Sequence, residues 1–270
     1  MGSPFFSIAT ISFNQAPFLG PAIESVLGQD FHDYEYIVQD PGSTDGSREI
    51  ISSYSSRISA SFEPDQGPAD GLNKAFSRAK GKYFLFLNSD DMLMPDSLAK
   101  LYKWINSDDH RHHVYSGACS VIDTRGRHLR YAYSDAMNLM MAAYGQCILI
   151  QPSSAISAMA FRAVDGFNAL NRSNWDGELF IDLALNGCQF ARSCHALSCY
   201  RVHAASITGS GSLYAQQAEE RRRLFTKITS KSYNERSRIL ADFYWLKRKL
   251  ANPLDTIERL LGGPIYGSCG

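Results

Sequence analysis

The sequence predicts an α/β fold in which helices flank a mostly parallel sheet. Strand-like apolar segments alternate with amphipathic helix-like segments four times within about ninety residues. This alternation is typical of parallel strands joined by crossover helices. The chain has 270 residues, 44% of them hydrophobic, which is enough for a sizeable core. In such sheets ligands bind beyond the carboxyl ends of the strands, so we expect the functional residues there.

The first third of the chain carries these elements in order. The strands come from runs rich in β-branched and aromatic residues, and each helix begins near a proline or after a Gly- and Ser-rich turn. Gly81 is expected to end the third helix. Strands are predicted at 5–13, 34–40, 58–64 and 82–88, and helices at 17–29, after the turn at 40–47, and at 67–81.

Composition excludes several classes of protein. The 27 basic and 27 acidic residues cancel, so no global charge indicates nucleic-acid binding. No apolar run has the length of a membrane span, and the first strand follows no basic and apolar leader, so a cytoplasmic protein is expected. The six cysteines are irregularly spaced and predict no disulfide framework. A zinc site at Cys188, Cys194, His195 and Cys199 is a minor alternative, because paired Cys-x-x-Cys motifs are absent.

Polar side chains stand at the carboxyl ends of three predicted strands. They are Asn14, Asp40 and Asp90, and Asp90 is followed directly by Asp91. Adjacent carboxylates at the end of a buried strand repel each other and lose hydration unless a positive group binds there. A helix cap is the alternative, since Asp96 follows Pro95 and precedes a helix-like run. Three such strand ends on one edge favour a binding site, and the turn at 40–47 offers an anion or ribose contact.

Four segments in a fixed order resemble the family 2 glycosyltransferases of the GT-A fold. Four ordered matches over about a hundred residues are more specific than any single motif. Fainter matches follow in "VDGFN", "NWDGELFIDLALNG" and "YRVHAASIT", whereas the last sixty residues match nothing in the family. The four segments are "ISFNQAPFLGPAIESVLGQDF", "EYIVQDPGSTDGS", "EPDQGPADGLNKAFSRAKGKY" and "FLFLNSDDMLMPD".

The resemblance implies a Rossmann-like, mostly parallel sheet with a C-terminal helical extension. It divides the chain into a nucleotide-sugar-binding half at 1–115, an acceptor-binding half at 116–208 and a helical tail at 209–270. Asp40 falls where the family contacts the nucleobase edge, and Pro41 replaces a second Asp of many relatives. The donor site implied by the resemblance comprises Ile11, Phe13, Asn14, Asp40, Asp70, Asn73, Lys74, Asn88, Ser89 and Asp90.

A divalent cation is implied by the same resemblance. The stretch from Asn88 to Asp91 stands in place of an Asp-x-Asp metal motif, with Asn88 removing one charge. Asp90, Asp91 and the late His203 are the candidate ligands for Mn²⁺ or Mg²⁺, which would stabilise the leaving diphosphate. Arg201 would pair either with phosphate or with solvent.

Asp176 is the candidate general base. An acceptor hydroxyl must lose a proton as it attacks the sugar, and a carboxylate within reach takes it in a single, inverting displacement. Asn174 or Asp176 would alternatively cap the helix that follows, and Glu178 is the reserve base.

The tail from 214 to 250 is basic, with ten Lys or Arg against four Asp or Glu. Its apolar residues recur at near-helical spacing. One interpretation is a pair of basic amphipathic helices on an anionic membrane surface, where a lipid-linked acceptor would be presented. The other, which we favour, is ordinary packing on the catalytic domain or on a second subunit of a homodimer.

The predicted function is therefore metal-dependent, inverting sugar transfer. The donor would be a UDP-, GDP- or dTDP-sugar and the acceptor a glycan or lipid-linked hydroxyl, in bacterial polysaccharide synthesis at the inner face of the membrane. A nucleotidyltransferase is a rival, but it would place a Gly-rich loop with Arg and Lys after the first strand, where "SFNQAPF" stands. A catalytically inactive binding or scaffold protein of the same fold is the second rival, mildly supported by Asn88 and Pro41.

Overall fold

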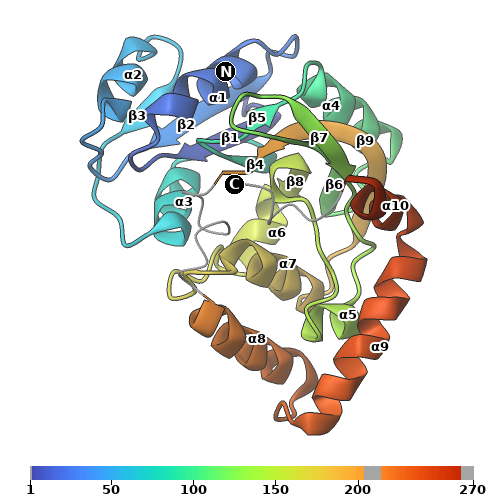
Figure 1. Ribbon diagram of the computed structural model, residues 1–270. Coiled ribbons are helices and arrows are strands. Elements are labelled where there is room, and N and C mark those ends of the chain that lie inside the picture. The colour runs from blue at the N-terminus through green and yellow to red at the C-terminus, as the bar shows by residue number, and fades with distance from the viewer. Residues whose placement is uncertain (1, 204–213, 263–270) are drawn as a thin grey trace.

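The structure is a computed structural model of the chain and describes residues 2–203 and 214–262. Its centre is a nine-stranded sheet with helices on both faces (Figure 1). The strand order is β3-β2-β1-β4-β8-β6-β9-β5, and β7 pairs with β6. The strands are β1 (Phe6–Ile11), β2 (Tyr34–Gln39), β3 (Ser59–Ser61), β4 (Tyr83–Asn88), β5 (Met92–Leu93), β6 (Val114–Ile122), β7 (His128–Ala132), β8 (Ser154–Ser157) and β9 (Phe190–Arg201).

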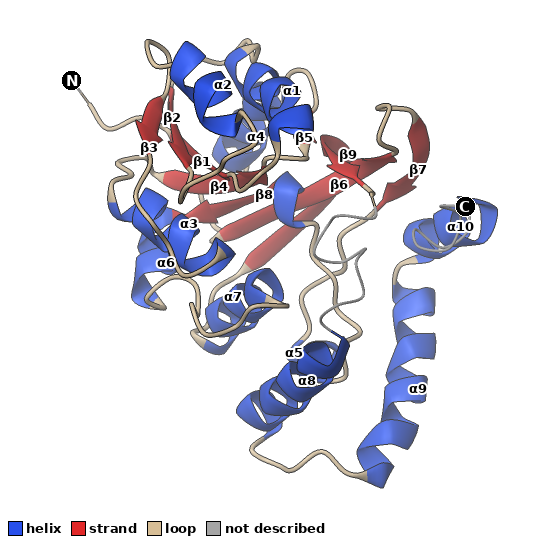
Figure 2. Ribbon diagram, turned by 60° about the vertical axis from the view of Figure 1, so that its left-hand side comes forward, coloured by secondary structure: helices blue, strands red, loops and turns tan. Residues whose placement is uncertain are grey.

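The helices form two layers over this sheet. In Figure 2, α1, α2 and α4 lie on one face, and α3, α6 and α7 lie on the other. The helices are α1 (Ala16–Leu27), α2 (Ser47–Ser53), α3 (Pro68–Ser77), α4 (Ser97–Ser107), α5 (Leu139–Ala143), α6 (Ala158–Ala163), α7 (Trp175–Leu185), α8 (Tyr214–Thr229), α9 (Glu235–Ala251) and α10 (Pro253–Gly262), with a short 3₁₀ turn η1 at Gln151–Ser153.

The first four strands are parallel, as the alternation predicted. β1 pairs with β2 on one side and with β4 on the other, and β2 pairs with β3. Their side chains are buried on both faces because each face has its own apolar cluster. Leu19 and Ile23 of α1 belong to one cluster, and Leu72 and Phe76 of α3 belong to the other. The predicted α/β fold is confirmed, and the carboxyl ends of β1, β2 and β4 share one edge.

The second half extends the sheet with mixed strand directions. β8 is antiparallel to both β4 and β6, and the long β6 is parallel to β9. β5 then pairs antiparallel with the end of β9, so that Met92 lies opposite Cys199. This pairing places the end of β9 beside the segment that follows β4.

One local prediction from the sequence is wrong, and another is confirmed only in part. Helix α3 ends at Ser77 rather than at Gly81. Gly81 is needed for close packing instead, since a Cβ atom there would come within 2.5 Å of the backbone nitrogen of Ser7. Asp96 occupies the N-cap position of α4 in a left-handed conformation, but its side chain makes no capping hydrogen bond.

The C-terminal helices pack on the second half through one face. Phe225 of α8 contacts Tyr144, which stacks on Tyr244 of α9 at 4.5 Å between ring centroids. The helices α8 and α9 therefore cover α5 and confirm the predicted helical extension (Figure 1). Within the described residues, no helix has both the length and the apolar character that crossing a bilayer requires.

Candidate active site

The loops after β1 and β2 are tied together by side-chain hydrogen bonds. The Asn14 backbone N–H donates to the Ser43 hydroxyl at 2.8 Å, and the Asn14 side-chain oxygen accepts from the Thr44 N–H at 2.9 Å. Asp45 accepts from the Ala16 N–H, also at 2.9 Å. Asn14 has a φ of 54°, a left-handed conformation that Asn tolerates better than most residues. These contacts hold the N-termini of α1 and α2 next to each other at the edge where β1 and β2 end.

Asp40 lies at the end of β2 and is fully buried. One carboxylate oxygen accepts from the N–H groups of Gly42 and Ser43 at 2.9 and 2.8 Å, and the other accepts from the Ser43 hydroxyl at 2.6 Å. The residue therefore shapes its own turn, as Asp often does in tight loops. Phe13, in contrast, is 61% exposed, and Ile11 is half-buried against the α3 side of the sheet. The nucleobase contacts assigned to these residues stay predictions.

The three candidate residues of α3 organise the loops around them. The Asn73 amide makes two hydrogen bonds to the backbone of Phe167, at 2.8 and 2.9 Å. Lys74 forms an ion pair with Asp70 at 2.9 Å and donates to the Pro64 carbonyl at 2.7 Å. The hydrogen bond from Lys74 keeps the pKa of Asp70 below its ordinary value. Asn73 thus connects the donor-side helix to the segment "VDGFN", a link that sequence reasoning did not provide.

The two adjacent carboxylates after β4 have different surroundings. Asp91 is 1% exposed, and it accepts from the Arg201 backbone N–H at 2.9 Å and from the Asn88 amide at 3.4 Å. Burial raises the pKa of Asp91 well above its ordinary value, and the nearby Asp90 charge adds to this rise. Ser89 is also buried. Asp91 is therefore held by protein donors inside the fold.

Asp90 is instead paired with His203. Its Oδ2 atom lies 2.9 Å from Nε2 of His203, and the two side chains are 18% and 6% exposed. The imidazole packs against the Phe18 ring at 4.9 Å. A carboxylate and an imidazole are both ligands of divalent cations. Of the three candidate metal ligands, the structure brings Asp90 and His203 into direct contact.

Arg201 is buried, and its guanidinium donates hydrogen bonds to backbone carbonyls. Its Nε donates to the Asp90 backbone carbonyl at 2.8 Å, and its Nη1 donates to the Asp123 carbonyl at 3.0 Å. The guanidinium also lies over the Phe18 ring, 5.0 Å from the centroid. Because the side chain is only 5% exposed, these contacts make Arg201 a support for the loop that carries Asp90. The burial of Arg201 contradicts the solvent alternative stated from the sequence, whereas the phosphate alternative stays a prediction.

A cavity of about 360 Å³ lies beside Asn88 and contains Asp176 in its wall. Asn88 donates to the Gln151 side chain at 3.2 Å, and Gln151 in turn donates to the Phe86 carbonyl. Sequence reasoning missed Gln151, Tyr200 and Arg259, because none of them falls in a motif that marks a site. The principal polar and aromatic lining residues are Asn88, Gln151, Trp175, Asp176, Tyr200 and Arg259.

Asp176 is in the first turn of α7. Burial raises the pKa of Asp176 above its ordinary value, and the backbone N–H groups of Gly177 and Asp176 itself only partly oppose this effect. The N-cap residue Asn174 makes no side-chain capping hydrogen bond. A partly buried carboxylate with a raised pKa on a cavity wall has the properties of a proton acceptor.

Glu178, the reserve base, has a different environment. It is fully buried and accepts hydrogen bonds from Arg223 at 2.8 Å, from Lys227 at 2.9 Å and from Asn171 at 2.8 Å. Hydrogen bonds from Arg223, Lys227 and Asn171 outweigh the opposing effect of burial and lower the pKa of Glu178 to about 2. A carboxylate stabilised in this way is a poor base, so its role is to fasten α8 to α7.

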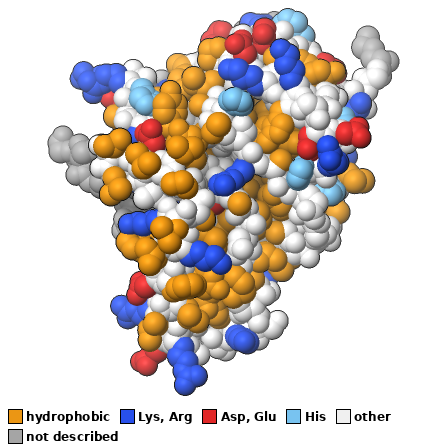
Figure 3. Space-filling model, turned by 90° about the vertical axis from the view of Figure 1, so that its right-hand side faces the viewer, with side chains coloured by type: hydrophobic (Ala, Val, Ile, Leu, Met, Phe, Trp, Pro, Cys, Tyr) orange, Lys and Arg blue, Asp and Glu red, His pale blue; other side chains and the backbone are white. Residues whose placement is uncertain are grey.

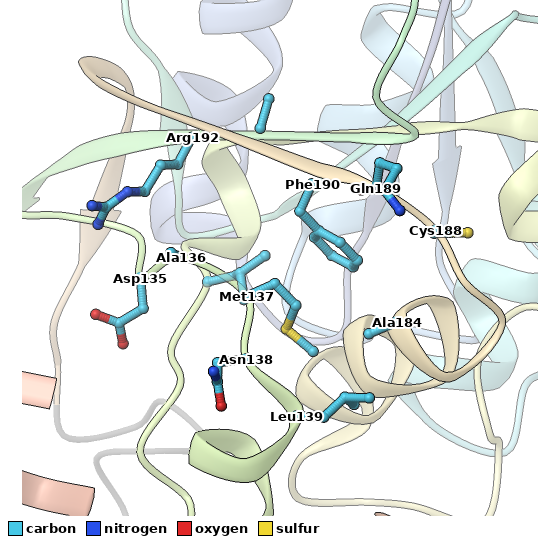
Figure 4. A pocket seen from close by; sticks show the side chains of 12 residues that line it. Asp135, Ala136, Met137, Asn138, Leu139, Ala184, Cys188, Gln189, Phe190 and Arg192 are labelled. Atoms are coloured by element: carbon cyan, nitrogen blue, oxygen red, sulfur yellow. The ribbon is translucent and has the colours of Figure 1, made fainter. Parts of the chain in front are cut away.

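A larger cavity, of about 440 Å³, lies elsewhere (Figure 4). Met137 and Phe190 lie at its centre, and Asp135 and Arg192 stand at one side. The Asp135 carboxylate binds Arg248 at 2.7 Å. Apart from Cys188 of the minor zinc alternative, none of the predicted donor, metal or catalytic residues lines this cavity, so its size does not make it the active site.

Few side chains at the site are able to bind a cation. In the parts of the chain that the structure describes, no three His, Cys, Asp or Glu side chains form a metal-binding group, at Cys188–Cys199 or elsewhere. Divalent cations in nucleotide enzymes are usually held by one or two carboxylates together with substrate phosphates. The Asp90–His203 pair fits this incomplete type of site, in which the donor supplies the remaining oxygens.

Several known proteins are similar to this chain in sequence. An uncharacterized glycosyltransferase of Rickettsia felis is 26% identical over 67% of this chain. An uncharacterized glycosyltransferase of Nostoc is 25% identical over 85% of this chain. Putative teichuronic acid biosynthesis glycosyltransferase TuaG of Bacillus subtilis is 39% identical over 36% of this chain. The chain spans 31% of the R. felis relative, 40% of TuaG and 74% of the Nostoc relative.

Solved structures share the fold. S. aureus TarS 1–349 in complex with UDP-GlcNAc superposes with a TM-score of 0.68 at 20% identity, covering 96% of this chain and 74% of that one. Mannosyltransferase PcManGT from Pyrobaculum calidifontis, in complex with GDP-Man and Mn²⁺, gives 0.64 at 17% identity over 96% and 75%. The family model described as Glycosyl transferase family 2 matches residues 7–165, more than half of the sequence. The chain therefore belongs to glycosyl transferase family 2.

Proposed function

We propose that this protein transfers a sugar from a nucleotide-diphosphate sugar to an acceptor hydroxyl, with inversion at the sugar carbon. One observation carries the proposal: Asn88 and Asp176 line the same cavity, and the Asp90–His203 pair stands two residues beyond Asn88. This arrangement supports a base on the cavity wall with a cation site close to Asn88 at the end of β4. The UDP-GlcNAc and GDP-Man complexes of TarS and PcManGT support a nucleotide sugar as donor, with UDP or GDP as the nucleotide. A dTDP-sugar is the third candidate donor that the sequence predicts.

Asp176 is the base in this proposal. The acceptor hydroxyl loses its proton to the Asp176 carboxylate as the oxygen attacks the sugar carbon. A raised pKa makes the carboxylate a stronger proton acceptor than an exposed Asp. Because the attack comes from the side opposite the leaving diphosphate, one displacement inverts the carbon.

Asp90 and His203 would hold the divalent cation, Mn²⁺ or Mg²⁺. When bound, such a cation stabilises the negative charge of the leaving diphosphate. The Arg201 side chain donates a hydrogen bond to the Asp90 carbonyl and so holds the Asp90 backbone in position. The Asp91 carboxylate accepts a hydrogen bond from the Arg201 backbone N–H. The Mn²⁺ complex of PcManGT supports the choice of metal.

The acceptor is proposed to be a glycan or a lipid-linked hydroxyl. TuaG, named for teichuronic acid biosynthesis, supports a role in polysaccharide synthesis. We propose the cavity wall formed by Trp175, Tyr200 and Arg259 as the acceptor side, since it adjoins Asp176. Aromatic faces of this kind suit the apolar faces of sugar rings.

The test is a panel of UDP-, GDP- and dTDP-sugars, assayed for release of the nucleoside diphosphate with and without Mn²⁺. Wild type should turn over one class of donor in a metal-dependent way, and Asp176→Asn should bind that donor without turning it over. Asp30→Asn, an exposed Asp outside the site, is the matched control and should behave as wild type.

The rival functions are distinguished by this assay and by a second one supplied with a sugar phosphate and a nucleoside triphosphate. Donor binding without turnover in wild type would indicate an inactive binding protein, which Asn88 and Pro41 mildly favour. Formation of a nucleotide sugar from a sugar phosphate and a nucleoside triphosphate would indicate a nucleotidyltransferase. Either result would refute the proposed transfer reaction.

A further inference from the structure

The outer sides of α9 and α10 carry an unusual number of exposed apolar side chains. Ten large apolar residues there are each at least 45% exposed. Figure 3 shows hydrophobic side chains gathered on this side of the molecule, with Lys and Arg among them. We call this the α9–α10 surface, and its residues are Ile239, Leu240, Phe243, Trp245, Leu246, Leu250, Leu254, Ile257, Leu260 and Leu261.

We propose that the α9–α10 surface docks onto an anionic lipid membrane. Apolar patches of this extent on a folded chain mark interaction sites. Since no described helix is able to cross a bilayer, the contact would be peripheral. The inference concerns this surface alone and does not depend on the proposed transfer reaction.

The apolar stripe on α9 lies opposite the side that packs on the domain. Ser237 and Arg248 are buried, and they lie on one side of the helix. Ile239, Phe243 and Leu246 follow one another at spacings of four and three, which places them on a single face. They are 71%, 58% and 53% exposed. An ordinary surface helix has a polar outward face, whereas the outward face of α9 carries this apolar stripe.

Basic residues flank this stripe on both sides. Arg236 and Lys247 are eleven positions apart, about three helical turns, and so lie along one flank. Arg238 and Lys249 have the same separation and lie along the other flank. Glu235 and Asp242 lie seven positions apart on the same flank as Arg238 and Lys249, so the net positive charge beside the stripe comes from Arg236 and Lys247.

This distribution of charge favours lipid over a second copy of the chain. An apolar face bordered by Lys and Arg is the pattern of helices that lie in the headgroup region of anionic membranes. The long basic side chains extend to the headgroups while the stripe enters the acyl region. Trp245 suits the same boundary, and Lys249 Nζ already lies 3.5 Å from its ring centroid. Two copies meeting through this face would bring like charges together.

Helix α10 extends the surface and is firmly joined to the domain. Asp255 is buried and binds Arg248 and Arg259 at 2.7 Å each, while Arg248 also binds Asp135 at 2.7 Å. The exposed Leu254, Ile257, Leu260 and Leu261 belong to the opposite side of the helix. Docking would therefore leave these ion pairs between α9, α10 and the domain intact. Because Arg259 lines the cavity that contains Asp176, docking would also bring that cavity close to the lipid.

The test is sedimentation of the full chain with phosphatidylcholine vesicles that contain or lack phosphatidylglycerol. Wild type should bind the anionic vesicles preferentially, and less at high salt. Each basic residue near an anionic surface contributes about fivefold in affinity, so Arg236→Gln with Lys247→Gln should weaken binding roughly 25-fold. Lys100→Gln with Lys103→Gln on α4 is the matched charge control and should leave binding unchanged.

A second pair of variants tests the apolar stripe. Leu246→Ser should weaken vesicle binding roughly tenfold, whereas Leu170→Ser, at a position 84% exposed and remote from α9 in sequence, should not. Circular dichroism and thermal unfolding of each variant verify that the fold is retained. Equal binding to neutral and anionic vesicles, or no binding, would overturn the proposal. A dimer in solution that Leu246→Ser dissociates, without vesicle binding, would assign the surface to a second copy instead.

Discussion

Asp90 and His203 are in contact at 2.9 Å although 113 positions separate them in the chain. The antiparallel pairing of β5 with the end of β9 produces this contact, because it places Met92 opposite Cys199. Asp91 and Arg201 reinforce the same junction through the 2.9 Å hydrogen bond between the Asp91 carboxylate and the Arg201 N–H. The candidate cation site is therefore assembled by the sheet and not by a local motif.

Replacing Asp90 should remove metal-stimulated donor binding. We expect Asp90→Ala to bind the donor equally with and without Mn²⁺, because the ligand carboxylate is lost while the rest of the junction remains. Isothermal titration calorimetry with and without Mn²⁺ measures this. Asp96→Ala, an exposed residue that makes no capping bond, is the control. Undiminished metal stimulation in Asp90→Ala would remove Asp90 from the site.

Replacing Arg201 should reduce stability. Lys at this position cannot reach both the Asp90 and Asp123 carbonyls, since it lacks the planar fork of donors. Leaving buried carbonyls unpaired costs about 1–3 kcal/mol, so Arg201→Lys should lower the free energy of unfolding by about 2 kcal/mol. Urea denaturation measures the change, with the exposed Arg192→Lys as control. A loss of the same size in both variants would contradict the positioning role.

Glu178 should make stability depend on pH in the acidic range. Its pKa is lowered to about 2 in the folded protein, against about 4.3 for an unperturbed Glu. Its contribution is therefore complete above about pH 4.3 and is lost as the pH falls towards 2. Glu178→Gln should lower the free energy of unfolding by about 2 kcal/mol at pH 7, because Arg223 and Lys227 lose their anionic partner.

The measurement is the difference in free energy of unfolding between wild type and Glu178→Gln as a function of pH. The gap in stability between wild type and Glu178→Gln should narrow between about pH 4.3 and pH 2 as wild-type Glu178 takes up a proton. Glu235→Gln, at an exposed position of α9, is the control and should show no such gap. A difference that is independent of pH would argue against the ion pairs.

Ionisation of Asp176 should determine how the enzymatic activity falls at acidic pH. Because the base acts only when ionised and burial raises the Asp176 pKa, turnover should fall as the pH drops through a value above the ordinary Asp range. Asp176→Asn should lower kcat by about 10²- to 10⁴-fold and abolish this acidic limb of the pH profile. The measurement is the pH profile of kcat/KM with saturating Mn²⁺. An acidic limb that persists unchanged in the residual activity of Asp176→Asn would assign it to another group.

The sequence by itself determined the parallel half of the sheet and the family of the chain. Strand and helix periodicities are local, so β1, β2 and β4 with their intervening helices follow from segments of a few residues each. The same segments carry the family's ordered motifs, and their polar ends, Asn14, Asp40 and Asp90, necessarily lie at one edge of the sheet.

Only the tertiary structure decided what those residues contact. Asp90 and Asp91 are adjacent in sequence but have different partners. Asp90 pairs with His203, and the buried Asp91 accepts a hydrogen bond from Arg201, because β9 pairs with β5 in one register. Arg259 enters the Asp176 cavity from α10, where no motif marks it. Sheet order and register depend on the packing of the whole chain, and local patterns carry no information about contacts made across more than a hundred residues.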